Sequence, residues 1–264
     1  MYGPRPPSDR PRDADRAVSD TVAFVLVFSL IITAAGLIAT VGFASLQDVQ
    51  AAQQSELSTG TLRAVGGEID EIAAGNRPAY RDSVELGGGR ITLVNETTVG
   101  VTVDNATGTV FDETYRPRAL TYAYEGRNMS YESGILARGS ERQPAILVSA
   151  PSGFRCSPAN DVAVVTVVQL VPGAAGAVSG GPVTVEARRV SSPPPTNVTR
   201  LEYPTTRPHP TATGVTVTVS GPWQAAWEEA LTAQGFTATG GGTATCTASQ
   251  VSIRLVRVEI GLLT

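Results

Sequence analysis

The stretch "DRAVSDTVAFVLVFSLIITAAGLIATVGFASLQDVQ", residues 15–50, decides the fold, because it is apolar and carries no charged residue between Asp20 and Asp48. As an α-helix, such a run exceeds the about 20 residues that the hydrocarbon core of a bilayer requires. We therefore predict a membrane-spanning helix over residues 18–46. A cleaved secretory signal is the alternative, but its apolar region is usually only about 7–15 residues long.

The basic residues of the chain predict the orientation of this helix. All 20 basic residues of the 264-residue chain are arginine. Four of them precede the apolar run, and positively charged flanks are retained in the cytoplasm. We expect a cytoplasmic basic leader at residues 1–17 and an extracellular domain after the helix. The four residues are Arg5, Arg10, Arg12 and Arg16.

The start of the helix resembles a known processing signal. Arg16, Ala17 and Val18, followed by Ser19 and the apolar run, resemble the class III signal of archaeal type IV pilins and archaellins. In that family a prepilin peptidase cleaves on the cytoplasmic side of the helix, which here implies a cut between Ala17 and Val18. The wider stretch also resembles haloarchaeal pilin-like proteins, whose helices assemble with other pilin-like subunits.

This resemblance covers roughly the first quarter of the chain and departs from the main pilins at one position. Many haloarchaeal pilins have Ser-Pro where this chain has Ser19-Asp20. The departure points to a minor or atypical subunit. Ser19 and Asp20 also suit a plain helix start, because Ser19 can cap the helix and Asp20 lies near the positive end of its dipole.

A second helical pattern follows the apolar run. Apolar residues recur at three- to five-residue spacing over residues 47–76, which predicts an amphipathic extension of the helix. Because glycine weakens helix interiors, we expect a break near Gly60 or at Gly66-Gly67. The apolar stripe consists of Leu46, Val49, Leu57, Leu62, Val65, Ile69 and Ile72.

The region from 83 to 190 alternates β-branched and polar residues between glycine-rich turns, which predicts a β-rich, sandwich-like domain. The stretch "DVAVVTVVQLV" at residues 161–171 is typical of a buried central strand. Four tyrosines form either a binding face or cross-strand packing, and alternation along strands favours packing. They are Tyr115, Tyr122, Tyr124 and Tyr131.

The composition changes at residues 191–214, a Pro/Thr-rich stretch that predicts a semi-rigid connector. Beyond it, residues 215–264 predict a small β-α-β part packed on the head. Trp223, Trp227 and Leu231 fall on one face of its helix and are expected in the core rather than in a ligand platform. The fold class expected is α+β, with a long N-terminal helix and a β-rich body.

The cysteines and the glycosylation motifs fit an exported domain. Cys156 and Cys246 are candidates for one disulfide, with two buried free thiols as the alternative. Four Asn-x-Ser/Thr motifs are candidates for N-glycosylation. Their acceptors are Asn95, Asn105, Asn128 and Asn197.

Composition argues against several function classes. The chain has no lysine and one histidine, His209, so it lacks a P-loop and a supported Ser-His-Asp arrangement. We expect no catalytic residue, no cofactor and no metal ligand. We also expect no nucleic-acid partner, because no basic stripe is present. If the protein were an enzyme, its catalytic groups would have to be acidic side chains scattered along the sequence. They are Asp112, Glu113, Glu125, Glu132 and Asp161.

Two hypotheses of function remain. The first is a non-enzymatic, pilin-like cell-surface subunit that assembles through its N-terminal helix and presents a glycosylated head for adhesion or envelope interaction. The second is a single-pass, membrane-anchored ectodomain that forms no filament. Processing at Ala17 distinguishes them.

Overall fold

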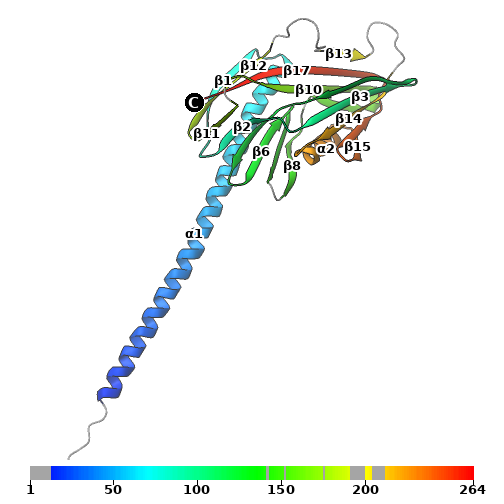
Figure 1. The fold of residues 1–264 in the computed structure, drawn as a ribbon. Coiled ribbons are helices and arrows are strands. Elements are labelled where there is room, and N and C mark those ends of the chain that lie inside the picture. Colours follow the sequence, from blue (N-terminus) through cyan, green and yellow to red (C-terminus); the bar gives the residue numbers. More distant parts are fainter. Residues whose placement is uncertain (1–12, 141–142, 152, 175, 191–199, 204–211) are drawn as a thin grey trace, which may run out of the picture. The chain divides into compact units, whose positions relative to one another are not determined.

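The computed structural model describes two compact units, Met1–Gln54 and Ser55–Thr264. One long helix, α1 (Asp13–Ala74), belongs to both units, and the second unit is otherwise rich in strands (Figure 1). The chain is therefore α+β with a β-rich body, as the sequence predicts. The described residues are 13–140, 143–151, 153–174, 176–190, 200–203 and 212–264.

In the first unit, α1 contains a span that is long and apolar enough to cross a membrane. Between Val22 and Ala39 the mean hydropathy is 2.7 and no side chain is buried. The Phe24 and Phe28 rings stack along the helix at 6.1 Å. The helix begins at Asp13, so the last residues of the expected leader are helical.

In the second unit, the apolar stripe of α1 is part of the core of the head. Leu62, Val65, Ile69 and Ile72 are at most 1% exposed. Because residues three and four apart lie on one face of a helix, this spacing buries one side and leaves the other in solvent. The predicted amphipathic extension is confirmed at these four residues, and the side chains of Leu46, Val49 and Leu57 lie outside the described residues.

The break expected near Gly60 or Gly66-Gly67 is wrong, because the helix continues through all three glycines. At Gly66 the reason is close packing. A Cβ atom built there would lie 2.5 Å from Cδ2 of Tyr131, so only glycine lets the tyrosine ring rest on the helix backbone. Packing against Tyr131 therefore compensates for the low helix propensity of glycine.

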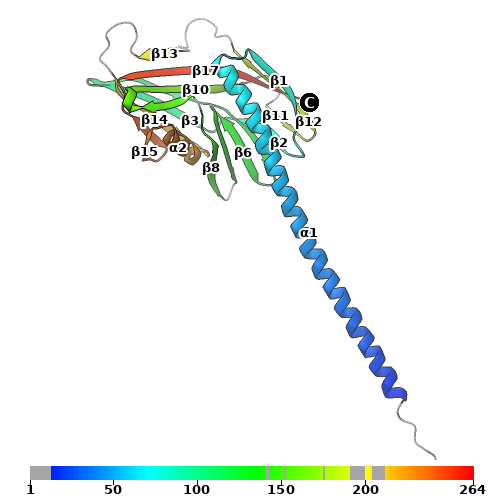
Figure 2. The same cartoon turned by 180° about the vertical axis from the view of Figure 1, so that it is seen from behind.

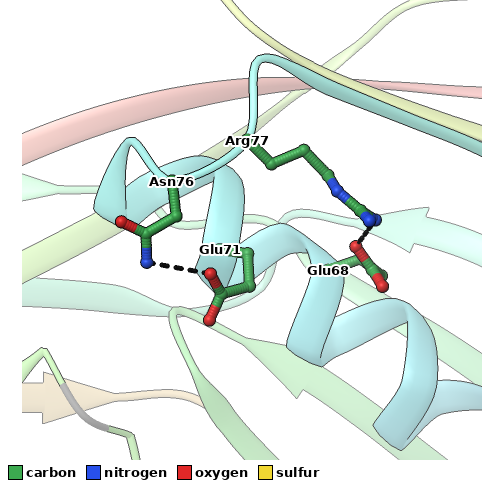
Figure 3. A network of polar contacts seen from close by, with 4 residues as sticks. All are labelled: Glu68, Glu71, Asn76 and Arg77. Atoms are coloured by element: carbon green, nitrogen blue, oxygen red, sulfur yellow. Dashed lines mark hydrogen bonds and ion pairs between the residues drawn. The ribbon is translucent and has the colours of Figure 1, made fainter.

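The C-terminal end of α1 is held by a glycine cap and by polar side chains. Gly75 has a φ of 90°, and its N–H donates to the carbonyls of Glu71 and Ile72. The Asn76 amide donates to Oε2 of Glu71 at 2.8 Å, and Arg77 pairs with Glu68 (Figure 3). This cap ends the helix at Ala74, two residues before the expected boundary.

Six strands form the first sheet, sheet A, in the order β1-β12-β17-β10-β9, with β13 paired to the first part of β17. Neighbouring strands are antiparallel except β10 and β17, which are parallel. The buried strand predicted near residues 161–171 is β10, which lies between β17 and β9. The bounds are β1 (Ala79–Glu85), β9 (Phe154–Ser157), β10 (Val162–Pro172), β12 (Pro182–Arg189), β13 (Arg200–Tyr203) and β17 (Gln250–Leu263).

Sheet B is an antiparallel sheet with the order β11-β2-β5-β6-β7-β8. Its strands β5 to β8 follow one another in sequence, which requires tight turns. Glu125 and Gly126 form one such turn with φ values of 47° and 74°. The bounds are β2 (Arg90–Val94), β5 (Ala119–Tyr124), β6 (Arg127–Glu132), β7 (Ile135–Ser140), β8 (Gln143–Ser149) and β11 (Ala177–Ser179).

Sheet C is antiparallel, has the order β15-β16-β14-β3-β4, and is accompanied by the helix α2. Trp223, Trp227 and Leu231 are buried against this part of the head, which confirms the core assignment made from sequence. The bounds are β3 (Thr98–Asn105), β4 (Gly108–Tyr115), β14 (Ala212–Ser220), β15 (Thr237–Gly240), β16 (Thr243–Cys246) and α2 (Gln224–Ala233), with a short 3₁₀ helix at Pro158–Asn160.

Figure 2 shows the three sheets from behind. Two hydrophobic cores lie among them. One core lies among sheets A and C, α2 and strand β7 of sheet B, and the other among sheets A and B and the last turns of α1. The paired strands β10 and β17 contribute side chains to both cores. In β17 the buried positions change from odd, Val251 and Ile253, to even, Val256 and Val258. Each half of this strand pair therefore supplies a different core.

The C-terminal part is more deeply integrated than a small part packed on the head. β14 pairs with β3 along its length, and β17 pairs with β10 and β12. Residues 200–203 of the expected connector form β13, and its last residues begin β14. The remainder of the connector lies outside the described residues.

The packing of Gly66 against Tyr131 generates a testable difference between neighbouring glycines. Gly66→Ala is expected to destabilise the protein by about 1–2 kcal/mol, because overpacking the tyrosine ring outweighs the gain in helix propensity. Gly67→Ala is expected to stabilise it by about 0.5–1 kcal/mol, because a Cβ atom there meets nothing within 4 Å. Denaturant unfolding measures both. Equal effects of the two substitutions would contradict the packing argument.

Candidate functional site

The most deeply buried polar groups of the head gather at the turn between β6 and β7, residues Tyr131–Gly134, which we call the β6–β7 turn. Ser133 and Gly134 have φ values of 51° and 86°, the left-handed geometry of a two-residue hairpin. All four residues are buried. A turn usually lies at the surface, so a buried one needs partners for its polar groups.

The first partner comes from α1. The hydroxyl of Tyr131 donates to Oδ1 of Asp70 at 2.6 Å. Burial raises the pKa of Asp70 to about 6, although the hydrogen bond from Tyr131 lowers it and the charge of Glu71 adds to the rise. The carboxyl group thus connects α1 to β6.

The second partner comes from α2. Nε1 of Trp227 donates to Oε2 of Glu132 at 2.8 Å, and the Glu132 residue is 2% exposed. Burial raises the pKa of Glu132 to about 7, although the hydrogen bond from Trp227 and the nearby Thr97 hydroxyl lower it. The Thr97 hydroxyl does not reach hydrogen-bonding geometry. Within the described chain, Oε1 of Glu132 and Oγ1 of Thr97 have no hydrogen-bond partner.

The third partner comes from sheet A. The N–H of Val168 on β10 donates to Oγ of Ser133 at 2.9 Å. Trp227 in turn packs its ring edge to face with Phe154 on β9, with centroids 5.5 Å apart. The β6–β7 turn therefore joins α1, α2 and sheet A, and it lies where both hydrophobic cores meet.

This arrangement positions elements and can bind protons, but it does not offer an acid–base pair to a substrate. Glu132 and Asp70 contact different elements, Glu132 buried inside the head and Asp70 partly buried on α1. Across the described ranges, no group of three or more His, Cys, Asp or Glu residues could hold a metal ion. The other acids flagged from sequence lie on β4, in the β5–β6 turn and at Asp161, where Ser249 donates to the carboxylate.

A surface depression of about 460 Å³ on sheet A is equally unlike an acid–base site, because its carboxylates are paired with arginines. Arg81 and Glu186 are 3.0 Å apart, and Arg188 and Glu259 are 2.7 Å apart. These cross-strand pairs tie β1, β12 and β17 together. The depression is an ion-paired hollow on the exposed side of sheet A.

Cys156 on β9 and Cys246 on β16 form a disulfide, with Cα atoms 5.7 Å apart. This is the pairing that the sequence analysis expected. The bond joins the edge of sheet A to sheet C beside the first hydrophobic core, across 90 residues of sequence. Closing so long a loop restricts the unfolded chain strongly.

The glycosylation candidates differ in accessibility. Asn95 is exposed, but the Thr97 of its motif is 2% exposed. Asn105 is itself 7% exposed, and its Oδ1 accepts hydrogen bonds from N–H and Oγ1 of Thr107. Asn128 is half-buried on β6, with Ser130 buried. Asn197 and the single histidine, His209, lie outside the described residues.

The processing residues lie in the described backbone of α1, because the helix begins at Asp13 and so includes Arg16, Ala17 and Val18. The tyrosines are divided between packing and solvent. Tyr122 and Tyr131 are buried in the second core, while Tyr115 and Tyr124 are half-buried. The two buried rings therefore pack in the core, Tyr131 against α1 at Gly66 and Tyr122 with its hydroxyl donating to the carbonyl of Leu86.

Sequence reasoning missed the β6–β7 turn. It placed Glu132 among scattered acids and gave Asp70 no role. The available signal was the turn sequence Glu132-Ser133-Gly134 after a strand with aromatic residues. Nothing in this sequence shows that the fold buries the Glu132 carboxylate. The pairing with Trp227, 95 residues away, has no local sequence signal.

The class of protein defined by these features is an α+β chain with one N-terminal helix able to cross a membrane and a disulfide-bonded, strand-rich head. The chain belongs to a family of unknown function, DUF7289, whose model matches residues 16–262. No curated protein and no solved structure matches the chain. The family match spans both the apolar helix and the head.

The disulfide between sheets A and C gives a direct test of its contribution. Replacing Cys156 and Cys246 together by alanine is expected to reduce the free energy of unfolding by about 2–5 kcal/mol. Thermal unfolding with and without reductant measures the effect. The reductant should lower the unfolding midpoint of the wild-type protein to that of the double variant, and it should leave the midpoint of the variant unchanged. A wild-type midpoint that reductant leaves unchanged would contradict the prediction.

Proposed function

We propose that the protein is a non-enzymatic, pilin-like surface subunit that is anchored or assembled through α1 and presents its β-rich head outside the cell. The observation that carries the proposal is the dual use of one helix. Its first part, Val22–Ala39, is wholly exposed and apolar, and its last turns, from Leu62 to Ile72, are built into the core of the head. One helix therefore carries both an apolar span and a structural part of the head.

The disulfide supports an oxidising location for the head, since structural disulfides persist outside the cytosol. Together with the arginines before the apolar span, it supports an orientation with the N-terminus inside and the head outside. The head would then meet other surfaces through faces such as the ion-paired depression on sheet A. Glycans at Asn95, where the acceptor is exposed, are part of this proposal.

The burial of the acidic residues supports a non-enzymatic role. The two carboxyl groups with pKa values raised toward neutrality, Asp70 and Glu132, are the ones that a general acid or base would require. Both are occupied by Tyr131 and Trp227 inside the core. They hold the fold together instead of facing a substrate.

A single-pass ectodomain that forms no filament is the alternative. Processing separates the two. A pilin-like subunit loses residues 1–17 before assembly, whereas a simple anchor keeps them.

We therefore expect the mature protein, recovered from membranes and from sheared surface material of its host, to begin at Val18. Peptide mass spectrometry of the N-terminus measures this. Ala17→Gln should block the cut, because it places a bulky residue beside the cleaved bond. Ala14→Gln is the matched control and should be processed normally. A retained N-terminus in the wild type would rule out the pilin-like role, and a start near Ser45 would indicate a secreted protein.

A further inference from the structure

Two carboxyl groups, the buried Glu132 and the partly buried Asp70, are held at consecutive residues of the β6–β7 turn. Tyr131 binds Asp70 of α1, and the next residue, Glu132, binds Trp227 of α2. The ion pairs found in the described part of the head are Arg77–Glu68, Arg81–Glu186 and Arg188–Glu259. None of them involves either buried carboxyl group, so the described head supplies no salt-bridge partner for their negative charges.

The groups that face Asp70 make its charged form unfavourable. From β6 it receives the Tyr131 hydroxyl, and from its own helix it meets the negative charge of Glu71. The tight turn closes over it, because a Cβ atom on Gly134 would lie 3.4 Å from its Oδ1. A carboxylate in such a place has one hydrogen bond and no opposite charge to offset its loss of water.

Glu132 is in a similar position. From α2 it receives Nε1 of Trp227, and from the loop between β2 and β3 it faces the Thr97 hydroxyl and the negative charge of Glu96. Its Oε1 and the Thr97 Oγ1 are both buried and unpartnered. A proton on Oε1 makes that atom a donor, and Thr97 Oγ1 is the acceptor beside it.

We propose that Asp70 and Glu132 form a proton-operated lock that holds the last turns of α1 in the head. With both carboxyl groups protonated, the β6–β7 turn is neutral and joins α1, α2 and β10. Loss of the protons leaves two buried, unpaired charges at the same turn and loosens its hold on α1. The lock lies within the head, so it does not depend on whether the protein forms filaments.

The direction of the pH dependence follows from the pKa values. Burial raises the pKa of Asp70 from 3.8 to about 6 and that of Glu132 from 4.5 to about 7. Between about pH 4 and pH 7 the folded state therefore binds more protons than the unfolded state. Stability from this source is present at low pH and is lost as the pH rises through the folded pKa values. Each group contributes up to about a hundredfold in the folding equilibrium constant.

The test is denaturant unfolding of the full chain in detergent micelles between pH 4 and pH 8. Asp70→Asn and Glu132→Gln keep an oxygen acceptor for Tyr131 and Trp227 and cannot ionise. We expect the wild-type folding constant to fall at least a hundredfold more than that of the double variant over this range. Glu113→Gln, on the exposed strand β4, is the matched control and should behave as the wild type does.

Two further measurements on the full chain address the mechanism and keep the proposal testable if the double variant folds poorly. Carbon NMR of the wild-type carboxyl groups should show Asp70 and Glu132 titrating above pH 5. Amide hydrogen exchange, corrected for its intrinsic pH dependence, should be faster at pH 8 than at pH 5 for residues 62–72. Titration of both groups below pH 5, or equal pH dependence in wild type and double variant, would overturn the proposal.

Discussion

The burial of the apolar stripe of α1 is the constraint on which the rest of the head depends. Full burial of Leu62, Val65, Ile69 and Ile72 is worth about 1.5–3 kcal/mol for each side chain. The sum is comparable to the net stability of a typical domain, about 5–15 kcal/mol. The second hydrophobic core therefore cannot be completed without the helix. The helix α1 contains the apolar, membrane-type span, and its last turns are a structural element of the head.

The β6–β7 turn extends this dependence to the first core. One turn receives Asp70 from α1, Trp227 from α2 and the N–H of Val168 from β10. The strand pair β10–β17 then runs from one core to the other, and the disulfide fastens sheet A to sheet C at the far side. The last turns of α1 are thereby linked to both cores of the head.

The sequence predicted those features that depend on local patterns. The apolar run, the amphipathic stripe and the buried strand β10 all follow from periodicity. The parallel pairing of β10 with β17 could not be predicted, because strand order depends on contacts between residues about 88 positions apart, such as Val165 and Ile253. The continuous helix at Gly66 was missed for a related reason, since the ring that requires a glycine there belongs to Tyr131. Glu132 looks like any surface acid until the fold buries it.

The most direct test of the central claim, that the last turns of α1 are an integral part of the head, compares two truncated chains. One begins at Ser55 and keeps the buried stripe, and the other begins at Gly75 and lacks it. The measurement is thermal unfolding followed by circular dichroism and tryptophan fluorescence. The account predicts a cooperative transition for the first chain and none for the second. A chain beginning at Gly75 that unfolds cooperatively at the same temperature as the longer one would contradict it.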